Sequence, residues 1–169
     1  GFTVLTLAGG KPRMSAISEH CRRSPEFICQ ALAQLKSSLL DDGNNAGTFV
    51  KDERLKAAVL AAPGLGFAFD AESLSDVRIP IQTWSGDRDE TVPSATNTDQ
   101  IAKGLGTLAE THSIPNASHF SFLQPCGLIR PEPFCTDPEG FDRVAAHKAM
   151  NAEVVEFFDS HMPPSSQRN

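Results

Sequence analysis

The sequence predicts an α/β fold in which the strands of a parallel sheet alternate with helices. Two short apolar runs, at 55–63 (LKAAVLAAP) and 79–86 (IPIQTWSG), are each closed by Pro or Gly, which is typical of strands buried in parallel sheets. Helical patterns follow at 94–106 and 141–161, and they are long enough to connect parallel strands by crossovers. Only about three strands are recognisable in this way, so we expect further strands or a partner to cover an edge of the sheet.

Composition places the chain among soluble globular proteins with one domain. It has 169 residues, of which 40% are hydrophobic and 21% charged, enough for one real core. The formal charge of -6 argues against a nucleic-acid partner, because such proteins concentrate Lys and Arg. No stretch reaches the roughly 18 apolar residues of a membrane span.

The pattern of apolar residues is less regular in the first fifty residues than in the remainder of the chain. The opening GFTVLTLAGG is apolar nearly throughout, so its pattern fits a buried strand as well as a buried helix. Residues 11–27 are predicted to be a loop, and a helix is predicted from Ile28 to Leu39, where Ala31, Leu32 and Leu35 continue an apolar stripe. The Asp, Gly and Asn residues at 41–45 end it. We interpret 11–51 as a loop and helix insertion.

The later elements are clearer. Pro80 must lie at the start of its strand, where a missing N–H does least harm. A helix is predicted from Ser94 to the 104–106 region, then a brief strand at 112–114, and then a final helix at 141–161. The expected buried side of that last helix is Val144, Ala145, the Lys148 stem, Val154, Val155, Phe157 and Phe158. The tail at 163–169 is expected to be disordered.

Four cysteines form two local pairs, Cys21 with Cys29 and Cys126 with Cys135. Neither spacing resembles the CxxC pattern of a zinc site. Two short-range disulfides are the favoured interpretation, and they would place the protein in the periplasm or outside the cell. The alternative is four unpaired thiols in a cytosolic protein.

Two aspartates and a histidine follow predicted strand ends, which is where parallel sheets meet ligands. Asp87 and Asp89 lie in GDRDETVP after the 79–86 strand, and His119 lies in NASHFSF after the 112–114 strand. Taken singly, each has an ordinary explanation: aspartates cap turns and helices, and a histidine in an aromatic loop is usually a packed surface residue. Together they have the order acid and then histidine, which follows the nucleophile in α/β-hydrolases.

The sequence resembles the α/β-hydrolase superfamily and, within it, the dienelactone hydrolase-like esterases related to the platelet-activating-factor acetylhydrolases. The similar segments cover most of the chain: AAVLAAPGLGF, IPIQTWSGDRDETVP, ASHFSFLQPC and GFDRVAAHKAMNAEVVEFF. By position, Asp89 matches the acid of the family's catalytic triad and His119 its base, while Asp87 is a turn residue or a supporting neighbour. The resemblance implies the C-terminal half of an α/β-hydrolase fold, within which residues 1–10 form a helix.

The chain departs from the family at the nucleophile. No GxSxG occurs between residues 1 and 169, so this motif, with its serine on a sharp strand-to-helix turn, is missing. We expect the serine just upstream of Gly1, in the missing N-terminal half of the same fold, together with the N–H groups of the oxyanion hole.

Other candidate residues are less favoured. Ser94 and Ser121 lack glycine-flanked turns, so capping and solvent exposure are their expected roles. Cys126 follows His119 in the chain and has a partner in Cys135, which argues against a thiol nucleophile. His20, His112, His147 and His161 show no ligand-like spacing, so neither a metal site nor a cofactor is expected. Arg143 is expected to pair with an acid.

The predicted function is serine-type hydrolysis of carboxylic esters, either acyl esters or lactones, by the full-length protein on a small-molecule substrate. This chain alone is predicted to be inactive. The alternative is a truncated, non-catalytic α/β fragment or an interaction module. A GxSxG upstream of Gly1 would favour the enzyme.

Overall fold

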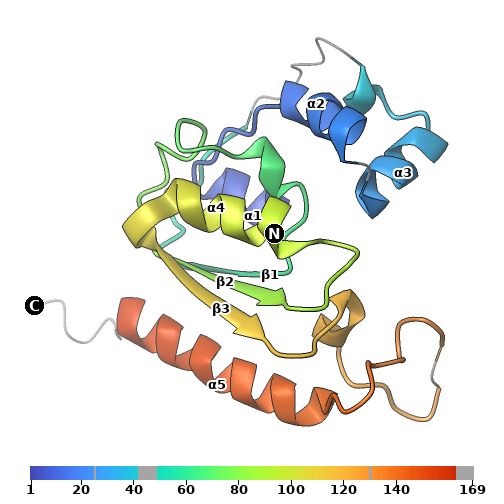
Figure 1. The fold of residues 1–169 in the computed structure, drawn as a ribbon. Coiled ribbons are helices and arrows are strands. Elements are labelled where there is room, and N and C mark those ends of the chain that lie inside the picture. The colour runs from blue at the N-terminus through green and yellow to red at the C-terminus, as the bar shows by residue number, and fades with distance from the viewer. Residues whose placement is uncertain (25, 42–48, 130, 163–169) are drawn as a thin grey trace, which may run out of the picture.

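A parallel sheet between helices forms the centre of the protein. The computed structural model describes residues 1–24, 26–41, 49–129 and 131–162. Its three strands are β1 (Ala58–Ala61), β2 (Ile81–Gly86) and β3 (Ala109–Ile114), in the order β1-β2-β3. Helices α1 (Phe2–Leu7) and α4 (Thr98–Leu105) cover one face, and α5 (Arg143–His161) covers the other (Figure 1). The predicted small α/β fold is therefore present.

The middle strand is the best protected of the three. All six residues of β2 are buried, and it pairs in parallel with β1 through Ala58↔Ile81 and with β3 through Gly86↔Ile114. Pro80 directly precedes β2, as predicted. In β1 only Ala58 and Leu60 are buried. A strand buried on both faces is expected here, and this expectation is wrong for β1, because Val59 is only half-buried and Ala61 is exposed on the face opposite Ala58 and Leu60.

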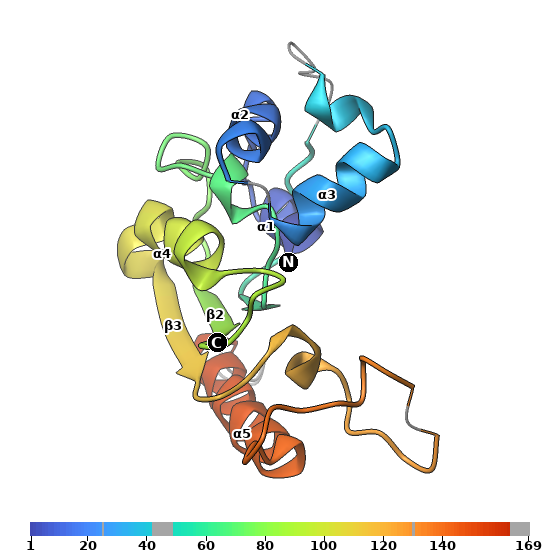
Figure 2. The ribbon, with the colours of Figure 1, turned by 45° about the vertical axis from the view of Figure 1, so that its right-hand side comes forward.

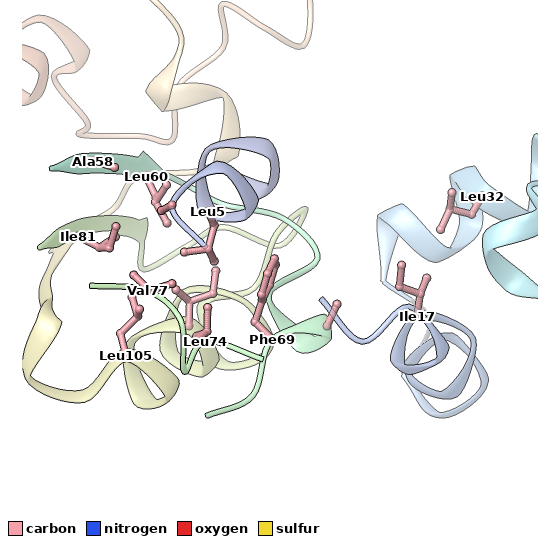
Figure 3. Close-up of a cluster of buried hydrophobic side chains, with 13 residues drawn as sticks. Leu5, Ile17, Leu32, Ala58, Leu60, Phe69, Leu74, Val77, Ile81 and Leu105 are labelled. Atoms are coloured by element: carbon pink, nitrogen blue, oxygen red, sulfur yellow. The ribbon is translucent and has the colours of Figure 1, made fainter. Parts of the chain in front are cut away.

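Aliphatic side chains from the helices meet those of the sheet in one core. Leu5 of α1 lies against Leu60 and Ile81, and Leu105 of α4 closes the cluster (Figure 3). Full burial of Leu5 explains why the opening segment is a helix, as the resemblance implies: its apolar residues supply one packed stripe rather than a two-faced strand.

Residues 11–51 differ most from expectation. The predicted loop at 11–27 is wrong, because α2 (Ser15–Arg23) lies within it and buries Ala16 and Ile17. The helix predicted to Leu39 is α3 (Phe27–Gln34), which ends early because Lys36 has a positive φ of 50°. Leu35 is therefore exposed. Of the predicted turn at 41–45, residues 42–45 lie outside the described part of the chain.

Short single-turn 3₁₀ helices complete the connections of the described chain, at Ser38–Leu40, Gly66–Ala68, Ser94–Thr96, Gly106–Leu108 and His119–Phe122. They are labelled η1 to η5 in this order. The helix predicted from Ser94 is thus η3 followed by α4, and the strand predicted at 112–114 begins earlier, at Ala109.

The last helix has the predicted extent but not the predicted buried side. Helix α5 begins after Asp142, whose side chain accepts a hydrogen bond from the Ala145 N–H, a standard N-cap. Phe157 is buried and Val154 and Phe158 are half-buried, whereas four of the predicted core residues are exposed: Val144, Ala145, Lys148 and Val155. The error arises because α5 lies along the face of the sheet opposite α1 and α4 (Figure 2), and only Arg143 and Phe157 of its described residues are buried. The tail at 163–169 is outside the described residues.

Candidate active site

Asp89 and His119 meet at the carboxyl edge of the sheet. Nδ1 of His119 lies 2.9 Å from Oδ2 of Asp89, within the hydrogen-bond distance expected from the order of these residues in the chain. The Asp89 side chain is 1% exposed and that of His119 is 28% exposed. With Nδ1 donating to the carboxylate, Nε2 is the ring nitrogen that can take up a proton.

The loop after β2 orients the Asp89 carboxylate. Oδ1 accepts hydrogen bonds from the N–H groups of Thr91, at 3.0 Å, and Val92, at 2.7 Å. The Asp89 N–H itself donates to the carbonyl of Gly86. Because these bonds occupy Oδ1, Oδ2 is left for the imidazole. Aspartate side chains in turns ordinarily accept hydrogen bonds from backbone N–H groups two and three residues further along. Here these bonds orient the Asp89 carboxylate.

A close approach of two backbones brings the acid and base loops together. The Arg88 N–H donates to the carbonyl of Ala117 at 3.1 Å, and the Asp87 N–H to that of Ile114 at 3.3 Å. Gly86 has no side chain, and a Cβ placed there would lie 2.4 Å from the Ala117 oxygen. The glycine of GDRD is therefore required for contact between the loops, whereas the exposed side chain of Asp87 does not take part in the pair.

His119 begins η5 (His119–Phe122), which is held by a reciprocal cap. The Ser118 N–H donates to Oγ of Ser121, and the two hydroxyls are 3.2 Å apart. Ser121 is therefore a capping residue as predicted, but the expected solvent exposure is wrong because the residue is buried. Its hydroxyl also donates to Asp137 at 3.2 Å. Ser94 is less buried and its hydroxyl lies 3.4 Å from Asp99.

The segment that follows η5 is linked to the His119 loop by hydrogen bonds and ring contacts. The guanidinium of Arg143, in GFDR, donates to the Asp137 carboxylate and to the carbonyl of Phe134, which confirms its predicted pairing with an acid. The Phe134 ring packs edge-on against Phe120, with ring centroids 4.9 Å apart. Phe120 in turn contacts the His119 ring.

Both cysteine pairs are disulfides. Cys21–Cys29 and Cys126–Cys135 have Cα–Cα distances of 5.3 and 5.9 Å, within the usual range for a bridge. No cysteine among the described residues is free. We expect unfolding without reductant to expose no thiol to a chromogenic thiol reagent, and unfolding with reductant to expose all four cysteines of the chain. Four reactive thiols before reduction would contradict both bridges.

A second histidine–carboxylate contact, which is not among the sequence predictions, lies on β3. Nε2 of His112 is 2.7 Å from Oε1 of Glu110, which also accepts from Gln82 at 2.6 Å. The hydrogen bond from Gln82, followed by that from His112, lowers the pKa of Glu110 below its usual value. The His112 ring stacks on Trp84. The sequence signal for this contact is the two-residue spacing of Glu110 and His112 on one strand and of Gln82 and Trp84 on the next. Residues two apart on a strand share a face of the sheet.

The lowered pKa of Glu110 predicts a pH-dependent contribution to stability. A carboxyl whose pKa is depressed on folding stabilises the protein above its unfolded pKa, and this stabilisation is lost as the pH falls through the folded pKa. We therefore expect Glu110→Gln to lower the free energy of unfolding at neutral pH and to have a smaller effect below roughly pH 4. Urea titrations at both pH values test this. An equal effect at both would contradict it.

A search of protein-family models finds none that matches the sequence. A search of curated proteins also finds no match. Within the described residues no three His, Cys, Asp or Glu side chains form a group that could hold a metal ion, and no described helix is both long and apolar enough to cross a membrane.

Proposed function

We propose that this chain supplies the acid and the base of a serine-type hydrolase of carboxylic esters. The observation that supports it most is the Asp89–His119 contact of 2.9 Å with a carboxylate that is almost completely buried. A buried acid that fixes one nitrogen of a partly exposed imidazole is the arrangement that general-base catalysis requires. The two short-range disulfides are compatible with an exported esterase.

In the proposed reaction Nε2 of His119 takes the proton from a serine hydroxyl as its oxygen attacks the ester carbonyl. The resulting imidazolium then gives the proton to the leaving alcohol, and an acyl-serine remains. A water molecule, deprotonated by the same nitrogen, releases the acid and regenerates the serine. Asp89 keeps the proton on Nδ1 and stabilises the positive imidazolium throughout.

We place the nucleophile in a segment preceding Gly1. Ser121 is a poor alternative because it is buried and bonded to Asp137, and Cys126 because it is in a disulfide. Gly1 lies close against Pro63, so that an added Cβ would be 2.5 Å from that ring. Pro63 follows β1, so Gly1 is at the sheet edge from which the Asp89 and His119 loops also emerge. A residue just before Gly1 would enter the same region.

The test compares residues 1–169 alone with the same chain joined to its upstream coding segment. We expect the joined protein to hydrolyse a short-chain chromogenic ester and to be labelled by a serine-directed phosphonate, and residues 1–169 alone to do neither. Full esterase activity from residues 1–169 would mean that the nucleophile is misidentified. An upstream segment without a serine in a GxSxG context would oppose the hydrolase proposal itself.

One observation favours the alternative, a non-catalytic interaction module. Leu128 and Ile129 are adjacent and exposed within the loop closed by Cys126–Cys135, and exposed apolar neighbours are common at protein contacts. An inactive joined protein whose Leu128→Ser variant lost binding to a partner would support this function instead.

A further inference from the structure

The carboxylate of Glu26 lies where two distant segments of the chain meet, around residues 20–26 and 96–97. Its Oε1 is 2.9 Å from Nε2 of His20 and accepts a hydrogen bond from the Thr96 hydroxyl. Its Oε2 accepts from the Asn97 amide at 3.3 Å. The side chain of Glu26 is only 9% exposed. A buried carboxylate is costly unless it is hydrogen-bonded in this way, so the cluster holds the two segments together.

Two of these contacts reach the loop that carries Asp89. Asn97 is 1% exposed, and its amide N–H also donates to the carbonyl of Pro93 at 3.0 Å. The residue before Pro93 is Val92, whose N–H donates to Oδ1 of Asp89. The path from Glu26 to the catalytic acid therefore consists of Asn97, the Pro93 carbonyl and the Val92 peptide, each joined to the next by a hydrogen bond or a covalent bond.

The other side of the cluster is fixed by the insertion and by the turn after β1. Glu26 lies within the loop closed by the disulfide Cys21–Cys29, and His20 directly precedes Cys21. The His20 ring stacks on Phe67 with centroids 3.8 Å apart and 8° between the planes. The neighbouring Gly66 N–H donates to Oδ1 of Asn97 at 2.9 Å. The disulfide and the packing of His20 on Phe67 thus restrict the position of Glu26.

We infer that Glu26 is a positioning residue for Asp89, and that helices α2 and α3, joined by the Cys21–Cys29 disulfide, act as a fixed brace for the acid of the acid–base pair. The inference rests on the proposed function. Its physical basis is that removal of the carboxylate leaves the half-buried Thr96 hydroxyl and the buried Asn97 amide with the Pro93 carbonyl as their shared backbone acceptor. Loss of a charged acceptor from such donors is costly, so the 92–97 segment rearranges and the hydrogen bonds that orient Asp89 loosen.

The test measures the Asp89–His119 hydrogen bond in residues 1–169 themselves, by the low-field NMR signal of the His119 Nδ1 proton, assigned with His119→Ala. In Glu26→Ala we expect this proton to exchange with water faster by on the order of tenfold, because a hydrogen bond to a charged group contributes more than a neutral one. Glu26→Gln retains an oxygen acceptor for Thr96 but places an amide N–H₂ against the Asn97 amide, so its exchange rate should lie between those of wild type and Glu26→Ala. Glu19→Ala, which removes an exposed carboxylate from the same insertion, is the matched control.

A second variant and a second measurement make every outcome informative. If Glu26→Ala does not fold, Glu26→Asp decides, because it keeps the charge but withdraws the carboxylate by one methylene. Exchange equal to that of Glu19→Ala in the decisive variant overturns the positioning role. In an active joined protein, that variant should lower kcat with KM little changed. Faster exchange beside a wild-type joined protein that shows no hydrolysis would retain the brace and reject the hydrolase.

Discussion

Replacing His119 with alanine in the joined protein is expected to lower kcat for a simple ester by about 10⁴- to 10⁶-fold. Without the imidazole, no described group takes the proton of the attacking serine, and the Asp89 carboxylate is left buried without its 2.9 Å partner. Substrate binding should change little, because the role of the base is in the transition state. Steady-state kinetics on a chromogenic ester, with unfolding midpoints as a check on folding, provide the measurement.

Two further variants test whether the effect is specific to His119 and whether Asp89 contributes to it. His161→Ala is the matched control, since His161 is exposed at the last turn of α5, and it should retain wild-type kcat. Asp89→Asn should cost about 10⁴-fold, because an amide in that position permits the wrong imidazole tautomer. If the joined protein is active and His119→Ala leaves its rate unchanged, the hydrolase assignment can stand but His119 is not its base.

Replacing Gly86 with alanine is expected to lower stability and to separate the acid and base loops. The new Cβ would lie 2.4 Å from the Ala117 oxygen, so the acid and base loops must move apart or β2 must shift within the sheet. Overpacking of a rigid interior site costs about 1–3 kcal/mol, sometimes more. Movement of the two loops apart would lengthen the Asp89–His119 contact. We expect lower stability in urea together with loss of the low-field His119 proton.

Gly64→Ala is the control for this variant. The nearest atom to a Cβ at Gly64 is in Val92, at 4.0 Å, an ordinary contact. Gly64 follows β1 as Gly86 ends β2, so the pair compares an open position with a closed one at the same edge of the sheet. Equal stabilities for the two variants would mean that the Gly86–Ala117 approach relaxes without cost.

The parts of the fold that follow from local pattern could be predicted from sequence. The expected ranges 79–86 and 141–161 differ from β2 and α5 by about two residues at the start, and Pro80 marks the start of the strand in the sequence. The contact between Asp89 and His119 could be predicted because chain order and position at strand ends constrain which loops meet. Pairing of the cysteines followed from their spacing.

What could not be predicted depends on contacts between distant segments. Helix α2 has a short sequence with two adjacent arginines, and it is stabilised by the disulfide to α3 and by burial of Ile17 rather than by its own propensity. The exposure of Val155 depends on how α5 lies on the sheet. The contacts of Glu26 with Thr96 and Asn97 join residues 70 and 71 positions apart, and no spacing rule links them.

The strand order β1-β2-β3 also has a consequence for the protein during its synthesis. Among the three described strands, each is added beside the one made immediately before it, so none of them has to enter between two that are already paired. The Asp89 loop is synthesised before β3 and the His119 loop, so the Asp89–His119 contact can form only after β3 has been made. Formation of this contact therefore depends on the last strand of the described sheet.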